Sequence, residues 1–277
     1  MLPEEGPVVS AVSLLVVVDP AARRVDPESV RIAKDVLSAG ATVKFCFPED
    51  TEEIERAFAH RGAKRPVLVG DDLALLRTVR LLHRERLLDE AALSVVPVGP
   101  PDGLVLTHRL GVPQDTVTAA RAVLDGVERR QGLLTDDSGG VVLGGLRVPA
   151  GAHDPGHGPH RRPGLWQRAL LHAPWPHGPA PHPPEEDGPR LRVEADGVVL
   201  ADLDRPVSQV HVSPADGARG LADVLIAVGS APVRASARCV RISGADFHYR
   251  ADAEIGGPVR TRTWTAHPQA WRLTLPR

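Results

Sequence analysis

Hydrophobic positions in the first half of the chain follow two alternating patterns, one typical of buried strands and the other of amphipathic helices. Short aliphatic runs predict strands at residues 14–18, 42–47, 66–69 and 93–98. Apolar positions at helical spacing predict helices at residues 27–38, 51–60, 73–88 and 116–127. Because the two types alternate with short connections, the sequence predicts an α/β domain with an open, mostly parallel sheet over residues 1–130.

The second half, residues 131–277, has short hydrophobic runs separated by Gly, Pro and Asp, with few helical patterns. The predicted strands are residues 141–148, 191–195, 197–203, 209–212, 223–228, 236–242, 247–250, 260–266 and 271–275. Regular spacing of short strands is typical of an antiparallel sandwich or barrel. Residues 150–189 are rich in Pro, Gly and His, and we expect a flexible insert there with one short helix near residues 165–171.

Composition excludes several classes of protein. The formal net charge is −2 and the mean hydropathy is −0.12, so no basic field favours nucleic acid. The longest apolar run, residues 8–18, is too short to cross a bilayer and lacks the basic start of a signal peptide. Cys46 and Cys239 stand far apart without a second cysteine at metal or redox spacing. We therefore expect a soluble cytoplasmic protein with reduced thiols.

Six of the twelve histidines lie between His153 and His182, which raises the question of a metal site. Their spacing is irregular and they stand among prolines, so adventitious metal capture is favoured over a specific zinc site. The sequence has neither the G-x-S-x-G motif of serine hydrolases nor the G-x-x-x-x-G-K-[ST] phosphate loop.

Residues 67–79 form a predicted strand, a turn and the start of a helix, with the turn read as Gly70-Asp71-Asp72. This element resembles the strand–GGDGT–helix motif of the diacylglycerol kinase, sphingosine kinase and NAD kinase group. The resemblance implies that Gly70 faces phosphate and that Asp72 organises a metal–nucleotide site. Asp71 stands where the family has a second glycine, so it adds a negative charge to the phosphate-binding turn. The alternative is that Asp71 and Asp72 are acids at the start of an ordinary helix.

Two further segments extend this resemblance towards the nucleotide. Residues 93–99, followed by Leu110-Gly-Val-Pro113, resemble the family strand that leads to a GTGND loop and an L-G-[IL]-P element. Gly99 would then face phosphate, while Pro100 and Pro101 remove backbone donors and favour a rigid turn instead. The dipeptide Asp19-Pro20 resembles the Asn-Pro of the first family strand, where Asp19 again brings negative charge towards phosphate. Arg23 or Arg24 could offset this charge, and the favoured alternative is that both arginines are ordinary solvent-facing residues.

The third segment is the C-terminal stretch around Asp252-Ala-Glu254, which resembles the family's D-G-E motif. The resemblance implies that Asp252 is the general base for a lipid hydroxyl and that Glu254 joins the metal network. Two carboxylates at i and i+2 on an extended segment would point to one face, which suits a base beside a Mg²⁺-organising acid. The alternative is a pair of acids in a polar hairpin.

Taken over nearly the whole chain, the resemblance implies a Rossmann-like, three-layer α/β domain of the NAD kinase and diacylglycerol kinase type, followed by a β-sandwich. The final strand would return to the first domain. The implied activity is ATP- and Mg²⁺-dependent phosphorylation of a lipid hydroxyl such as that of diacylglycerol. The alternative is a non-catalytic pseudoenzyme that binds or regulates. A homodimer and peripheral contact with a membrane are both compatible with this interpretation.

Overall fold

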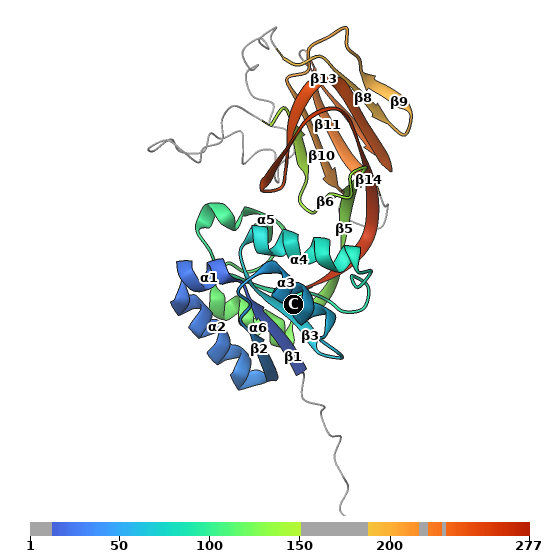
Figure 1. The fold of residues 1–277 in the computed structure, drawn as a ribbon. Helices are drawn as coiled ribbons and strands as arrows, with labels where there is room; N and C mark the ends of the chain where they lie inside the picture. Colours follow the sequence, from blue (N-terminus) through green and yellow to red (C-terminus); the bar gives the residue numbers. More distant parts are fainter. Residues whose placement is uncertain (1–12, 151–187, 216–220, 229–230) are drawn as a thin grey trace, which may run out of the picture.

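The computed structural model describes residues 13–150, 188–215, 221–228 and 231–277. Its first part, residues 13–125, contains a parallel sheet (Figure 1), and the strand order of this sheet is β2-β1-β3-β4. The strands are β1 (Ser13–Val18), β2 (Thr42–Cys46), β3 (Arg65–Gly70) and β4 (Ser94–Pro97). All three strand pairs are parallel, which confirms the predicted α/β architecture of this part.

Helices cover both faces of this sheet. They are α1 (Pro20–Val25), α2 (Pro27–Gly40), α3 (Thr51–Ala59), α4 (Asp72–Arg84), α5 (Val105–Arg109) and α6 (Thr116–Asp125), with a 3₁₀ turn η1 (Pro101–Gly103). Along β1, Leu14 and Val16 pack into one core with α2 and α6, whereas Leu15 and Val17 pack into the other with α3 and α4. Alternate residues of one strand thus fill two cores, and the result is the three-layer arrangement.

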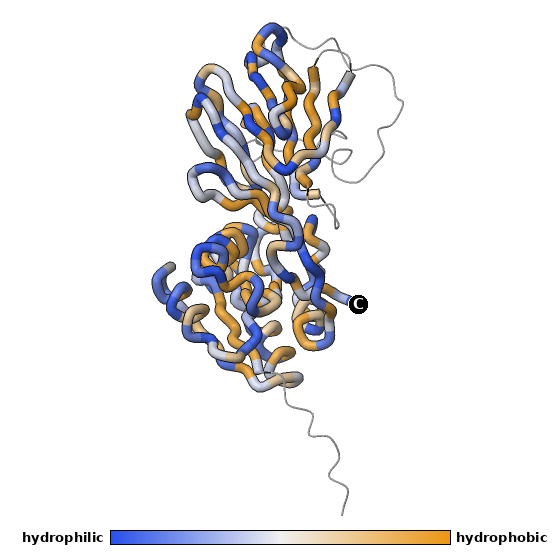
Figure 2. The backbone as a smooth tube through the Cα atoms, turned by 90° about the vertical axis from the view of Figure 1, so that its right-hand side faces the viewer, coloured by the Kyte–Doolittle hydropathy of each residue, from blue (hydrophilic) through white to orange (hydrophobic). Residues whose placement is uncertain are grey.

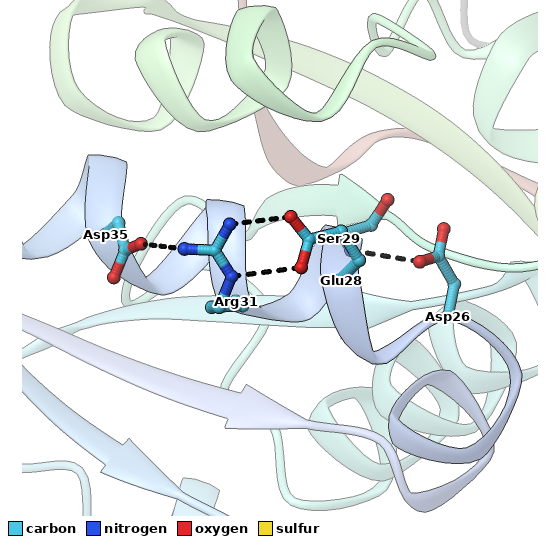
Figure 3. Close-up of polar contacts among 5 residues, drawn as sticks. All are labelled: Asp26, Glu28, Ser29, Arg31 and Asp35. Carbon is cyan, nitrogen blue, oxygen red and sulfur yellow. Dashed lines mark hydrogen bonds and ion pairs between the residues drawn. The ribbon is translucent and has the colours of Figure 1, made fainter.

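The N-terminus of α2 shows how local sequence begins a helix (Figure 3). Asp26 accepts a hydrogen bond from the Ser29 N–H at 3.0 Å, and Pro27 follows at the first helical position. Arg31 is held by Glu28 at 2.6 Å and by Asp35 at 2.9 Å, three residues before it and four after. These are the capping and side-chain spacings that favour an isolated helix.

Replacing Asp26 with alanine is expected to lower the free energy of unfolding by about 1 kcal/mol, because the helix loses its N-cap. The Ser29 N–H lowers the pKa of Asp26, so this contribution is present above the ordinary aspartate pKa and is lost as pH falls through the lowered value. Urea unfolding at neutral and acidic pH measures it. Asp35→Ala, which removes only an exposed ion pair, should leave the free energy nearly unchanged.

The second part, the described residues of 127–277, is a single antiparallel sheet of ten strands with main order β12-β11-β10-β7-β13-β14-β5-β6, from which β8 and β9 branch at β13. The strands are β5 (Val127–Asp136), β6 (Val141–Val142), β7 (Leu146–Val148), β8 (Leu191–Ala195), β9 (Val198–Ala201), β10 (Gln209–Pro214), β11 (Ala222–Val228), β12 (Ala231–Ala237), β13 (Cys239–Ala251) and β14 (Glu254–Leu275). An all-β second half is confirmed.

Several elements differ from the sequence prediction. The strands predicted at residues 236–242 and 247–250 contribute to one strand, β13, and neither α1 nor β5 was predicted. The short strands predicted at residues 260–266 and 271–275 belong to one strand of 22 residues, β14, which is continuous through a register shift between His267 and Trp271. The strand predicted at residues 141–148 is broken into β6 and β7 by Leu143-Gly144-Gly145. The helix predicted near residues 165–171 lies outside the described residues.

The core of the second part is formed by strands of the main order together with β8, and Trp264 and Val210 are among its buried residues. Tyr249 meets the Trp264 ring edge-on at a centroid distance of 5.2 Å. Figure 2 shows hydrophobic stretches running through the strands of both sheets.

The end of β14 returns to the parallel sheet, as expected (Figure 1). Leu93 forms a bridge with Leu273, and the buried Ser94 hydroxyl donates to Thr274 Oγ1 at 2.9 Å. Trp271 and Leu133 join the same core as α3 and α4. Apolar packing therefore links the two sheets. None of the described helices is long and apolar enough to cross a membrane.

Candidate functional site

Asp19 follows the carboxyl end of β1 and is buried, with 2% of its surface exposed. Its Oδ1 accepts the Ala21 N–H at 2.8 Å and caps α1, while its Oδ2 lies 2.8 Å from Arg77 Nη2 of α4. Arg23, which the sequence suggested as a compensating charge, instead donates to the Pro48 carbonyl. The negative charge of Asp19 is therefore neutralised by a residue that the sequence analysis did not single out.

The turn after β3 is closely packed. A Cβ atom at Gly70 would lie 2.8 Å from the Cβ of Ala74 and 3.1 Å from that of Asp19, so only glycine fits there. Asp71 is the N-cap of α4, and its Oδ1 accepts the Ala74 N–H at 2.9 Å. The Asp71 carboxylate thus already accepts a hydrogen bond from one of the N–H groups that the start of a helix could donate to phosphate.

Asp72 is the most deeply buried of the predicted metal ligands, with 3% of its surface exposed. Its Oδ2 accepts the Leu106 N–H at 2.7 Å and its Oδ1 accepts the Thr107 N–H at 2.9 Å. Burial raises the pKa of Asp72, against the effect of these two N–H groups. Helix α5 has no side-chain cap of its own, so Asp72 acts as its N-cap from a neighbouring helix.

The turn after β4 touches the turn after β3. A Cβ atom at Gly99 would lie 3.0 Å from the Cβ of Asp71, and the Val98 N–H donates to the Gly70 carbonyl at 3.0 Å. Pro100 leads directly into η1. The structure thus brings Asp19, Gly70, Asp71, Asp72 and Gly99 together at one edge of the sheet. Gly70 packs closely against Asp19, and Gly99 packs closely against Asp71.

Asp252 lies at the tip of the hairpin between β13 and β14, with a φ of +50°. The expectation of an extended segment is therefore wrong at this residue, because Asp252 and Ala253 form the two-residue turn. The Asp252 carboxylate accepts N–H groups from Leu143 and Gly144, each at 2.7 Å, and from Gly145 at 3.0 Å. Burial raises the pKa of Asp252 to about 6, against these three N–H groups and the charge of Arg109.

Glu254, the first residue of β14, is held by Arg80 of α4 in a bidentate pair. The distances are 2.9 Å from Nη1 to Oε1 and 2.6 Å from Nη2 to Oε2. This pair raises the pKa of Arg80, and the charges of Asp252 and Asp136 act in the same direction. Arg77 and Arg80 are three residues apart and lie on one face of α4, so this helix supplies the counter-charge to acids from both parts of the molecule.

The two groups of predicted residues meet at α5. A Cβ atom at Gly144 would lie 2.8 Å from Leu106 Cδ1 and 2.9 Å from Asp252 Oδ1. The N–H of the same Leu106 donates a hydrogen bond to Asp72. Sequence reasoning missed Arg77, Arg80 and the Leu143–Gly145 segment. Two signals in the sequence could have found them. Arg77 and Arg80 stand at helical spacing, and the pair Gly144-Gly145 interrupts the strand predicted at residues 141–148.

These geometries test whether the predicted acids fit Mg²⁺ and ATP. Mg²⁺ needs oxygen ligands in near-octahedral geometry. Each Asp72 oxygen accepts a backbone N–H and the side chain is buried, while both Glu254 oxygens face one guanidinium group. In the observed arrangement these residues do not fit a Mg²⁺–nucleotide complex. Among the described residues, no group of three or more His, Cys, Asp or Glu side chains could hold a metal ion.

No protein-family model and no curated protein sequence matches this chain. Its fold, however, is similar to that of solved structures from Bacillus anthracis str. Sterne. A candidate diacylglycerol kinase superposes with a TM-score of 0.70 at 13% identity, covering 96% of this chain and 97% of that one. A diacylglycerol kinase superposes with a TM-score of 0.67 at 14% identity, covering 96% and 98%. The chain therefore has the two-part fold of these proteins, as its motifs predicted.

Proposed function

We propose that this protein is a non-catalytic protein on the diacylglycerol kinase fold, which binds a lipid with a free hydroxyl, such as diacylglycerol, without transferring phosphate to it. The observation that carries the proposal is the bidentate pair between Arg80 and Glu254. The Arg80 guanidinium group, whose Nη2 lies 2.6 Å from Glu254 Oε2, takes the position that a metal cation would need at this carboxylate. Both carboxylate oxygens of Glu254 accept hydrogen bonds from it.

The other acids of the site support the same interpretation. Asp19 is paired with Arg77, Asp71 caps α4, and Asp72 caps α5. Phosphoryl transfer from ATP depends on cations that neutralise the phosphate oxygens. In this site the fixed arginine charges are instead used to neutralise carboxylates of the chain itself.

The lipid part of the proposal rests on the similarity to diacylglycerol kinase structures and on exposed apolar side chains beside the site. Leu73 follows Asp72, Val105 precedes Leu106, and Ile255 follows Glu254. Their exposed fractions are 43%, 55% and 59%. Large apolar side chains that border a polar site are a suitable surface for a lipid ligand.

A second candidate is ATP-dependent phosphorylation of a lipid hydroxyl, which one observation favours. The pKa of Asp252 is raised to about 6, a value suited to a general base near neutral pH. Asp252 would accept the proton of the hydroxyl group. Binding of ATP and Mg²⁺ would require Arg80 to leave Glu254 and α5 to lose its cap at Asp72.

Calorimetry with ATP and Mg²⁺ separates the two candidates. We expect no heat of binding at millimolar ATP and no phosphate transfer to diacylglycerol in vesicles, because the acids are neutralised by arginine or used as helix caps. We also expect the protein to co-sediment with phosphatidylcholine vesicles that contain diacylglycerol and to bind less to vesicles without it.

Lipid-dependent ATP turnover that disappears in Asp252→Asn would establish the kinase and reject the non-catalytic assignment. Asp35→Asn, which removes an exposed carboxylate of α2, is the matched control and should leave such turnover unchanged. Equal binding to vesicles with and without diacylglycerol would reject the lipid part of the proposal.

A further inference from the structure

A polar hollow lies at the opposite edge of the parallel sheet from the site described above. It has a volume of about 290 Å³ and is lined by the loop before β3, the loop before β4, and one residue each from β5 and β14. We call it the amino-edge pocket, and its charged lining residues are Arg61, Lys64, Arg65, Glu90, Glu128 and Arg272. The length of β3 separates it from Gly70 by roughly 17 Å.

Two ion pairs form the walls of the amino-edge pocket. The Arg61 side chain is only 7% exposed, and its Nη2 lies 2.6 Å from Glu90 Oε2. Arg272 Nη1 lies 2.9 Å from Glu128 Oε2, and its Nη2 donates to the Asp89 carbonyl. Each carboxylate of the lining is therefore matched by one arginine, whose guanidinium group is held in a fixed orientation.

Lys64 and Arg65 remain as positive charges in excess of these pairs. Arg65 donates to the Val123 carbonyl at 3.1 Å, which orients the group without neutralising it. Lys64 is half-buried, and its ammonium group forms no hydrogen bond or ion pair with any described residue. The pocket thus carries two uncompensated cations, which an anionic ligand would neutralise.

The backbone between Arg61 and Lys64 adds donors to the same pocket. Gly62 has a φ of +59°, and a Cβ atom built on it would meet nothing within 4 Å, so the approach to this turn is open. The N–H groups of Gly62 and Ala63 donate no hydrogen bond to a described residue. Consecutive N–H groups at a left-handed turn form an anion-binding concavity.

We propose that the amino-edge pocket binds a small ligand through a dianionic phosphate group. Two excess cations match the two charges of a phosphate, and guanidinium and ammonium groups with backbone N–H groups are its usual protein partners. Its uncharged side chains are those of Ala63, Ala91 and Ala92, with no aromatic ring or long aliphatic chain. The ligand is accordingly small and polar, such as free phosphate or a short phosphate ester.

Titration of the full chain with inorganic phosphate and with glycerol 3-phosphate, followed by calorimetry at constant ionic strength, tests this site. We expect saturable binding that Lys64→Ala weakens by about tenfold and Lys64→Arg largely restores. Lys44→Ala, which removes an exposed lysine from β2, is the matched control and should bind as the native chain does. Tighter binding of the ester would identify an organic phosphate as the ligand, and equal binding would identify free phosphate.

Backbone amide NMR locates the binding independently of any variant. The signals of Gly62 and Ala63 should shift on addition of phosphate, while those of Leu143, Gly144 and Gly145 beside Asp252 should not. Binding that is unchanged in Lys64→Ala, or amide shifts confined to the other edge of the sheet, would overturn the proposal. The result is independent of the lipid assignment, because the two sites share no residue.

Discussion

Replacing Trp271 with alanine is expected to lower the free energy of unfolding by about 3–5 kcal/mol, the usual cost of removing a buried tryptophan. Trp271 is fully buried and belongs to the core that also contains Leu75 and Leu82 of α4 and Leu133 of β5. Its Nε1 donates to the Gly132 carbonyl at 3.3 Å, so the variant also leaves a carbonyl without its partner. The cavity would lie where the two sheets share their packing.

Because this core joins the two parts, the native chain is expected to unfold in one cooperative transition. Urea unfolding followed by tryptophan fluorescence and by circular dichroism should give coincident curves, and Trp271→Phe should lose much less stability than Trp271→Ala. Two separate transitions in the native chain would contradict the shared core. A loss below about 1 kcal/mol in Trp271→Ala would contradict its burial.

The second large effect is expected at Asp252, where Asp252→Asn should cost about 2–3 kcal/mol near pH 4 and less at neutral pH. The substitution replaces one carboxylate oxygen, an acceptor, by an NH₂ group, which is a donor. This NH₂ group would face the N–H groups of Leu143, Gly144 and Gly145, which are donors as well. The hairpin tip would then lose its attachment to the segment between β6 and β7.

The pH dependence of this variant provides a sharper measurement. Burial raises the pKa of Asp252 from 3.8 to about 6, so between these values the native state binds more protons than the unfolded state. This contribution to the stability of the native chain is present below pH 4 and is lost as pH rises to about 6. Asp252→Asn should lack this decrease.

Urea unfolding of both proteins at several pH values between 4 and 7 gives the difference directly. Ala253→Gly, which changes the same turn without removing the carboxyl group, is the matched control and should keep the decrease. Parallel curves for the native chain and Asp252→Asn would assign the pH dependence to another group. A native stability that rises over this interval would show that the three N–H groups outweigh burial.

Much of the secondary structure could be predicted from the sequence. The runs that became β1 and β3 are aliphatic and end at Asp19 and Gly70, because strands buried on both faces leave no place for polar residues. The helical periodicity of α4 and α6 was equally clear. The sequence also located the acids Asp71 and Asp72 at the turn before α4, whereas it placed Asp252 on an extended segment and offered the hairpin only as the alternative.

The partners of those acids could not be predicted. Asp19 and Arg77 are 58 residues apart, and Arg80 and Glu254 are 174 residues apart. Hydrophobic periodicity says which face of a helix is buried, but it carries no information on which distant carboxylate meets an arginine at the edge of that face. The same holds for Asp72, whose capping of α5 depends on two helices meeting.

The sequence by itself therefore determined most of the elements, the order of the α/β and all-β halves, and the resemblance to a kinase fold, because local patterns of burial and turn residues are sufficient for each. Only the tertiary structure decided what the acids do. Burial and ion pairing depend on which elements pack together, and that packing places Arg80 on Glu254, the Leu106 and Thr107 N–H groups on Asp72, and three backbone N–H groups on Asp252.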